Sequence, residues 1–280
     1  MAVRRRLLVL RNLGLGDFLT GIPSLRGLRR AFPDHELVLV APEALRDLAR
    51  LCGAVDRLVS SPPLDRTDIA VNLHGRGPES HGLPRWRADE HEVARWCRLL
   101  SETSIPADAT DLRLEVEPAG IAGATVVHPG AASGSRRWPA ERFAAVARAE
   151  REAGRDVLVT GGAAEARLAR TVAEGAGLPE SAVLAGRKSL ADLAGVVAAA
   201  GRVVCGDTGV AHLATAVGTP SVVLFGPIPP HEWGPPPNPK HRALWAGLTG
   251  DPHAEDVHAG LLAIDVGDVL AELQGLEPAA

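Results

Sequence analysis

The sequence predicts an α/β fold made of two doubly wound domains, each a parallel sheet flanked by helices. Three observations carry this prediction: short runs that are apolar throughout, amphipathic stretches between them, and one break in the alternation near the middle of the chain. Strands buried on both faces read as continuous apolar runs, and strands that alternate with helices are typical of parallel sheets.

Eight short runs are expected to form strands, and most of them are apolar rather than alternating. They are 6–10, 36–41, 69–74, 125–130, 156–161, 182–186, 202–207 and 221–226.

Amphipathic stretches between these strands are expected to form helices, and three of them are long. They span about 89–103, 139–154 and 189–201. Pro139 suits the first position of the second helix, and Gly154 suits the position just past its end. Ser189, with Asp192 three residues later, forms a near capping box at the start of the third helix.

The alternation is lost between about 75 and 122, where a turn-rich stretch, a helix and an irregular segment follow one another. We therefore expect an N-terminal domain over 1–118 and a C-terminal domain over 119–280, whose last helix could pack back on the first domain. Loops at the carboxyl ends of the strands should line a cleft between two such domains.

Composition narrows the class of protein. The net charge is −4 for 280 residues, which predicts no nucleic-acid partner. The three cysteines are scattered and form no C-x-x-C, so neither a disulfide framework nor a zinc site is indicated, and a cytoplasmic location is expected. The apolar run after the first arginines is too short for a signal peptide, and no stretch approaches a membrane span.

The first strand runs into the loop "RNLGLGDFLT", which contains Gly14, Gly16 and Gly21. A dinucleotide-binding turn needs G-x-G-x-x-G, but Leu19 occupies the place of the third glycine. A nicotinamide oxidoreductase is therefore the least favoured class of enzyme. The loop instead carries Asp17, a carboxylate of the wrong charge to hold a phosphate.

Four loops that follow expected strands in the second half are polar beyond the needs of packing: 128–139, 160–169, 206–214 and 225–237. Asp207, Thr208 and Gly209 would begin a helix whose free N–H groups suit a diphosphate. The alternative is that Asp207 or Thr208 only caps this helix and that His212 packs one turn later.

Arg136, on another of these loops, could hold phosphate oxygens in a fork and so favours the diphosphate interpretation. Glu165 by itself is a first-turn partner of the helix dipole, and becomes a ribose ligand only if a nucleotide lies there. Trp138 and Trp233 are more typical of packing than of stacking on a ligand.

Four segments resemble glycosyltransferase family 9, the heptosyltransferase-like enzymes. They are "LGLGDFLTGIPSLRGLRRAFP", "HPGAASGSRRWPAERFAAVA", "DTGVAHLATAVGTPSVVLFGP" and "LLAIDVGDVLAEL". The resemblance implies the GT-B fold, with two Rossmann-like domains facing across a cleft, the donor nucleotide on the second and the acceptor on the first. It also implies inverting, metal-independent transfer without a cofactor, and the chain has no Asp-x-Asp metal motif.

The resemblance assigns roles to residues of this chain. Asp17 matches the aspartate taken as general base, which accepts the proton of the acceptor hydroxyl; the alternative is a helix N-cap, and both could hold. Arg136 stands where the family usually has a lysine that neutralises the leaving diphosphate. The other expected donor ligands are Asp207, Thr208, Gly209 and His212 for the diphosphate, and Glu165, Gly161, His128 and Gly130 for the nucleotide. The expected acceptor ligands are Gly16, Asn72, His74 and Arg76.

The expected substrates are a nucleotide-diphospho-sugar, first of all one like ADP-heptose, and a glycan, glycolipid or small-molecule acceptor. The sequence neither predicts nor excludes peripheral contact with the inner membrane surface. The first domain is short for the family, and the missing part falls between 75–82 and 87–96, near the expected acceptor. Two alternatives remain, a GT-B nucleotide-sugar epimerase and a non-catalytic GT-B binding module. The Gly-Asp loop favours the transferase.

Overall fold

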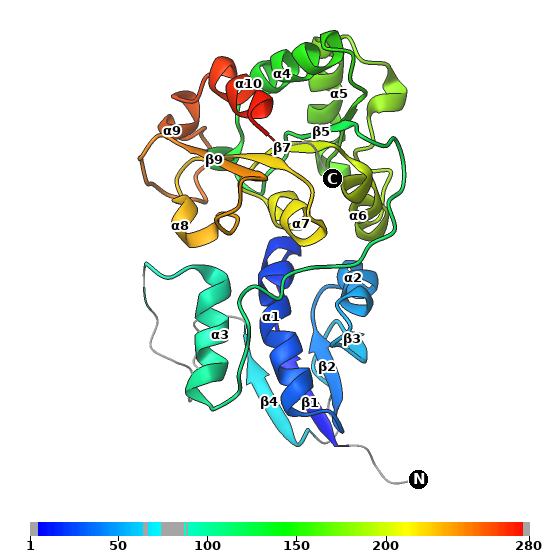
Figure 1. The fold of residues 1–280 in the computed structure, drawn as a ribbon, viewed down its shortest axis with the longest axis vertical. Coiled ribbons are helices and arrows are strands. Elements are labelled where there is room, and N and C mark those ends of the chain that lie inside the picture. Colours follow the sequence, from blue (N-terminus) through cyan, green and yellow to red (C-terminus); the bar gives the residue numbers. More distant parts are fainter. Residues whose placement is uncertain (1–4, 64–66, 74–86, 88, 277–280) are drawn as a thin grey trace. The chain divides into compact units, whose positions relative to one another are not determined.

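The structure is a computed structural model that describes residues 5–63, 67–73, 87 and 89–276. The chain divides into two compact units, Met1–Glu115 and Val116–Ala280. Each unit is built on a parallel sheet with helices packed around it, as Figure 1 shows. The predicted α/β class is confirmed.

The first unit has a four-stranded parallel sheet in the order β3-β2-β1-β4. Its strands are β1 (Arg6–Leu10), β2 (Glu36–Val40), β3 (Arg57–Val59) and β4 (Ile69–Asn72), and its helices are α1 (Leu15–Ala31), α2 (Arg46–Leu51) and α3 (Glu92–Glu102), with a 3₁₀ turn at Glu43–Leu45. Helix α1 buries Phe18, Ile22 and Leu25, which are spaced to share one face, and packs against α3.

The second unit has a five-stranded parallel sheet in the order β6-β5-β7-β8-β9. Its strands are β5 (Thr125–His128), β6 (Val157–Val159), β7 (Arg202–Gly206), β8 (Ser221–Phe225) and β9 (His241–Trp245). Its helices are α4 (Ala140–Glu152), α5 (Ala166–Ala176), α6 (Leu190–Ala199), α7 (Gly209–Val217), α8 (Pro230–Trp233), α9 (Ala259–Leu262) and α10 (Val266–Gln274), and its 3₁₀ turns are Gly134–Arg136, Ala163–Glu165 and Glu180–Ala182.

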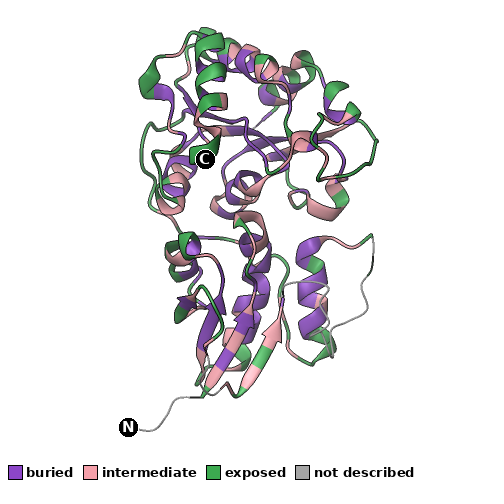
Figure 2. Ribbon diagram, turned by 180° about the vertical axis from the view of Figure 1, so that it is seen from behind, coloured by how far each residue is buried: buried purple, intermediate pink, exposed green. Residues whose placement is uncertain are grey.

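Strands β5, β6 and β8 are buried along their whole length, and they appear purple in Figure 2. This is why these segments read as continuous apolar runs. Helix α10 packs against α4 and β8. Among the described residues, no helix combines the length and the apolar character that a membrane crossing requires.

The predicted helix ends are mostly confirmed. The Ser189 hydroxyl accepts a hydrogen bond from the Asp192 N–H at 3.1 Å, and the Asp192 carboxylate accepts one from the Ser189 N–H at 3.1 Å, which closes the capping box. Gly154 follows α4 with φ of 81°, the left-handed region that glycine reaches without strain. Pro139 is the N-cap residue of α4 rather than its first helical residue.

Trp138 is a packing residue, as its type predicts. Its side chain is buried, and its ring lies edge-on to Phe143 with 5.0 Å between the centroids. Its indole N–H donates to the carbonyl of Ile264 at 3.0 Å.

One predicted strand is absent from the structure, and two observed strands were not predicted. The run 182–186 is not a strand. It begins in a 3₁₀ turn, and Val183 forms a single isolated β-bridge with Val159 of β6. Strands β3 and β9 were not predicted from the sequence. Both contain exposed or half-buried residues, so neither gives a continuous apolar run.

Candidate active site

Asp17 lies in the first turn of α1, the helix that follows the first strand. The helix begins at Leu15 with Gly14 as its N-cap residue, so Asp17 is its third residue. The alternative that Asp17 is the N-cap is therefore wrong. Its side chain is 28% exposed, so solvent or a ligand can reach it.

Arg11, directly after β1, fixes the backbone beneath Asp17. Its side chain is 1% exposed. Its Nε donates to the carbonyl oxygen of Asp17 at 2.6 Å, and its Nη1 donates to the carbonyl oxygen of Leu73 at 2.5 Å. Its Nη2 lies 3.1 Å from the hydroxyl of Thr20, which itself donates to the Asp17 carbonyl. The start of α1 is thereby tied to the ends of β1 and β4.

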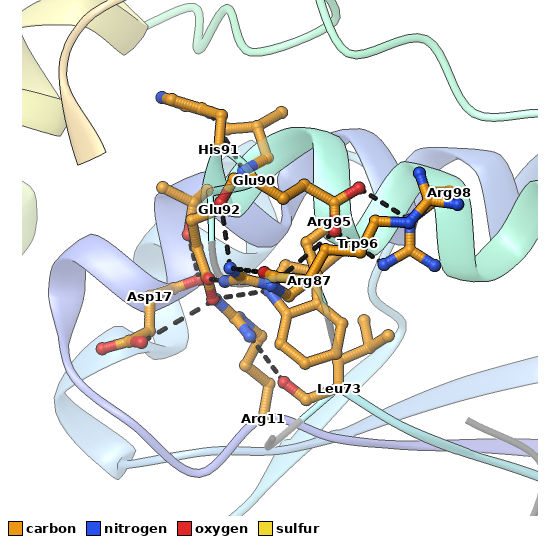
Figure 3. A network of polar contacts seen from close by, with 12 residues as sticks. Arg11, Asp17, Leu73, Arg87, Glu90, His91, Glu92, Arg95, Trp96 and Arg98 are labelled. Atoms are coloured by element: carbon orange, nitrogen blue, oxygen red, sulfur yellow. Dashed lines mark hydrogen bonds and ion pairs between the residues drawn. The ribbon is translucent and has the colours of Figure 1, made fainter. Parts of the chain in front are cut away.

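Two carboxylates share the charge of Arg11. Its Nη2 lies 3.1 Å from Oε1 of Glu92 and 3.8 Å from Oδ1 of Asp17 (Figure 3). Glu92 is buried at the start of α3, accepts the indole N–H of Trp96 at 2.7 Å and pairs with Arg95.

Burial raises the pKa of Asp17, and the negative charge of Glu92 raises it further. The positive charge of Arg11 opposes both effects without cancelling them. Asp17 is therefore a stronger proton acceptor than an aspartate in water.

The expected acceptor residues are placed only in part. Gly16 lies in the first turn of α1, next to Asp17. Asn72 is the last residue of β4 and pairs in register with Leu10 of β1, so it lies at the same edge of the sheet as the loop that leads to Asp17. His74 and Arg76 lie outside the described residues.

In the second unit, the expected donor residues follow three neighbouring strands. His128 of β5 is in register with Cys205 of β7, and Val127 of β5 is in register with Val159 of β6. Because the strands are parallel, the loops after β6, β5 and β7 all leave the sheet on one side, at the carboxyl ends of the strands. The predicted donor residues therefore lie at the carboxyl ends of neighbouring strands in a single sheet.

Glu165 lies directly against Gly130 and Gly161, two glycines of the predicted nucleotide site. Its Oε2 accepts a hydrogen bond from the Gly162 N–H at 2.7 Å, as expected of an acid in a first turn. A Cβ atom added to Gly130 would lie 2.0 Å from Oε1 of Glu165, and one added to Gly161 would lie 3.1 Å from its Cβ. The absence of a side chain at Gly130 therefore makes room for the carboxylate.

His128 is buried at the end of β5, and its Nδ1 lies 2.9 Å from the hydroxyl of Thr160. Burial lowers the pKa of His128, while the charge of Glu165 acts in the opposite direction. The imidazole is therefore neutral at neutral pH and acts as a hydrogen-bonding group rather than as a cation.

Arg136 and Asp207 form an ion pair in which Nη1 and Oδ2 are 3.4 Å apart. Asp207 is buried, and this burial raises its pKa while the charge of Arg136 opposes the rise. The Nε of Arg136 has no hydrogen-bond partner among the described residues. A Cβ on Gly206 would lie 3.0 Å from the Arg136 carbonyl oxygen, so the turn that carries Arg136 lies against the end of β7.

Helix α7 begins at Gly209, with Thr208 as its N-cap residue. Thr208 makes no side-chain capping hydrogen bond, and the Asp207 carboxylate accepts a hydrogen bond from Arg136 rather than from the start of the helix. The structure therefore does not bear out the alternative that these side chains serve as caps. His212 lies one turn into the helix, where its ring is edge-on to Trp233 with 5.7 Å between centroids.

Arg11, Glu92 and Trp96 were not predicted from the sequence as residues of the site. Arg11 interrupts an apolar segment directly after a strand, which is the one local signal of a buried cation. Glu92 and Trp96 lie far along the chain, so their meeting with Arg11 depends on the packing of α3 against α1. Within the described part of the chain, no group of three or more metal-ligating side chains occurs.

Comparison with known proteins identifies a family whose model this chain matches. Residues 85–259 match the model of "Glycosyltransferase family 9 (heptosyltransferase)". The chain is 36% identical to lipopolysaccharide heptosyltransferase 1 of Pseudomonas aeruginosa, over 70% of this chain and 56% of that protein. It is 29% identical to lipopolysaccharide heptosyltransferase 3 of Escherichia coli, over 62% of this chain and 53% of that protein. The chain thus spans about half the length of the curated relatives it matches.

The fold also has close counterparts among solved structures. The ADP-heptose lipopolysaccharide heptosyltransferase II of E. coli superposes with a TM-score of 0.78 at 21% identity, covering 96% of this chain and 97% of that one. At this identity the likeness concerns the fold.

Proposed function

Because the chain belongs to glycosyltransferase family 9 and has the GT-B fold, we propose that it transfers a heptose from ADP-heptose to an acceptor hydroxyl, with Asp17 as general base. The resemblance seen in the sequence is confirmed at the level of family and fold. The donor is inferred from the relatives, which are named as lipopolysaccharide heptosyltransferases, and from the ADP-heptose in the name of the E. coli structure.

The observation that carries the proposal is the surroundings of Asp17. A carboxylate that is to accept a proton must be reachable, rigidly placed and basic enough to be useful. Asp17 is 28% exposed, its backbone carbonyl is held by Arg11 at 2.6 Å, and burial raises its pKa. A surface aspartate that merely balanced a helix dipole would need none of these features.

The second unit supports donor binding. The N–H groups that open α7 receive no side-chain cap from Thr208, so they are suited to the oxygens of a diphosphate. Arg136 adds a guanidinium nearby, and its side chain is 23% exposed, so it can donate to a phosphate oxygen. Glu165 lies against Gly130, and we propose that its carboxylate accepts hydrogen bonds from the ribose hydroxyls.

In the proposed reaction the acceptor oxygen attacks the anomeric carbon of the heptose. Its proton passes to the Asp17 carboxylate as the new C–O bond forms, and the bond between the sugar and the diphosphate breaks on the opposite face, so the anomeric configuration inverts. Arg136 and the start of α7 stabilise the charge that grows on the departing ADP. No step of this scheme requires a metal ion.

We place the reaction at the cytoplasmic side of the inner membrane, with a lipopolysaccharide-type glycolipid as the acceptor. The names of the relatives support this acceptor class. The epimerase alternative is disfavoured by the family match and by Asp17, since epimerisation needs no base for an acceptor hydroxyl.

The test is release of ADP from ADP-heptose, with and without truncated lipopolysaccharide acceptors. The proposal predicts ADP release that depends on the acceptor, together with a heptosylated product. Consumption of the donor without an acceptor, giving an isomeric sugar nucleotide, would favour the epimerase. Donor binding without any turnover across the acceptor series would favour the non-catalytic module.

A further inference from the structure

We propose that Arg11 and Glu92 are positioning residues for Asp17: Arg11 holds the first turn of α1 by its backbone, and Glu92 takes up the Arg11 charge so that the Asp17 carboxylate stays open to a proton. The inference rests on the proposed role of Asp17 as the base.

The grip on the backbone comes from the reach of the guanidinium. Arg11 donates to the Asp17 carbonyl at 2.6 Å and to the Leu73 carbonyl at 2.5 Å. Helix α1 lies close against it, because a Cβ on Gly21 would be 3.0 Å from the Arg11 Nε. A planar group with five donors can hold these acceptors together, whereas a lysine ammonium cannot span them.

The positive charge of Arg11 is shared unequally between Glu92 and Asp17, as two distances from its Nη2 show. Nη2 of Arg11 is 3.1 Å from the Glu92 carboxylate but 3.8 Å from the Asp17 carboxylate, so the closer ion pair is with Glu92. Glu92 is held in this place by the indole N–H of Trp96, whose ring lies 4.8 Å from the guanidinium carbon (Figure 3). The pairing of Glu92 with Arg95 on the same helix fixes it further.

This arrangement addresses a conflict in the site. An arginine is the best anchor for the backbone beneath Asp17, but an arginine paired directly with a carboxylate lowers its pKa and occupies its oxygens. The charged groups that bear on Asp17 are Arg11, after β1, and Glu92, on α3, and the backbone near Gly14 also favours the charged form. With Glu92 in place, the effect of burial prevails and the pKa of Asp17 is raised.

Glu92→Gln tests the role of the charge, since it keeps the shape and an acceptor for Trp96. The acid limb of the kcat profile should move to lower pH by roughly one unit, the scale of one nearby charge, and KM for ADP-heptose should not change. The matched control is Glu102→Gln on the same helix, where Glu102 pairs with Arg98 at 2.8 Å and is 44% exposed. If both variants keep the wild-type profile, Glu92 has no such role.

Arg11→Lys tests the grip on the backbone, since it keeps the charge. We expect kcat to fall by about tenfold or more, the equivalent of about 1.4 kcal/mol, with an unchanged KM for the donor. A folded Arg11→Lys protein with the wild-type kcat would overturn the positioning role of Arg11.

A measurement on the wild-type protein covers the case in which a variant does not fold. The carboxyl carbon of Asp17 can be assigned by NMR, as the aspartate signal missing from Asp17→Asn, and titrated without any substrate. The inference predicts a midpoint above that of an ordinary aspartate, and a midpoint below it would show that Arg11 pairs directly with Asp17 and overturn the inference. A raised midpoint in a protein that binds ADP but transfers no sugar would contradict the proposed function instead.

Discussion

The guanidinium of Arg136 lies 3.4 Å from the buried carboxylate of Asp207, at the start of the helix proposed to bind the donor diphosphate. A negative side chain at such a place repels a diphosphate, so the side chain of Asp207 is better suited to hold Arg136 than to bind the donor. We therefore propose that the contribution of the Asp-Thr-Gly segment to the diphosphate comes from its backbone, and that Arg136 exchanges part of its pairing from Asp207 to phosphate oxygens.

Arg136→Ala should weaken both ADP binding and transfer. A charge-assisted hydrogen bond is worth about 1.5–3 kcal/mol, which corresponds to roughly 10–150-fold. The loss should be larger in kcat than in ADP affinity, because charge grows on the diphosphate as the bond breaks. Calorimetric titration with ADP and initial rates measure the two effects.

The control for this variant is Arg137→Ala in the same turn, whose exposed side chain donates to the carbonyl of Ala131 at 2.9 Å. It should bind ADP as the wild type does. Equal losses in the two variants would indicate a general disturbance of the turn, and unchanged kinetics of Arg136→Ala would remove Arg136 from the donor site.

Asp207→Asn should retain ADP affinity or increase it, by at most about tenfold, or about 1.4 kcal/mol. The substitution keeps the shape and removes the negative charge that opposes a diphosphate. Titration with ADP and a melting curve on the same preparation measure the effect. A large loss of affinity in a folded protein would instead assign the Asp207 carboxylate a direct contact with the donor.

Gly130→Ala should displace Glu165 and weaken ADP binding. The added Cβ would lie 2.0 Å from the Glu165 Oε1, so the carboxylate must move. If Glu165 accepts hydrogen bonds from the ribose, at least one is lost, which costs roughly tenfold in affinity. Gly267→Ala is the matched control, because nothing lies within 4 Å of a Cβ added there. Equal ADP affinity in the two variants would contradict the assignment of Glu165 to the nucleotide.

Metal independence is tested by binding and turnover in EDTA. ADP at roughly a hundred times its dissociation constant should stabilise the protein by about 2.7 kcal/mol, and EDTA should change neither this gain nor the rate of transfer. Loss of either one in EDTA, with recovery on adding a divalent cation, would show that a metal takes part.

The sequence predicted those features that local rules determine. Buried strands such as β5 are visible in the sequence as apolar runs, and the Ser189 capping box is a short-range pattern, so both could be predicted. Strand β9 is buried only at His241, so it lacks this signature. Asp17 could be proposed as the base because the resemblance to a family marks its loop.

The surroundings of Asp17 could not be predicted from the sequence. Arg11 and Glu92 are 81 residues apart and meet only through packing between α1 and α3. Local patterns carry no information on such a contact, or on how a buried cation divides its charge between two carboxylates. The direction of the Asp17 pKa shift depends on this division, so it required the structure.

The most direct test of the proposed function is the transfer rate of Asp17→Asn, measured on the same preparation as its melting temperature and its ADP affinity. Asparagine keeps the shape of the side chain but cannot accept the proton, and loss of a general base costs about 10²–10⁴ in rate. We predict a folded protein that binds ADP normally and transfers heptose at least about a hundredfold more slowly than the wild type. A folded Asp17→Asn protein that transfers heptose at close to the wild-type rate would contradict the assignment of Asp17 as the base.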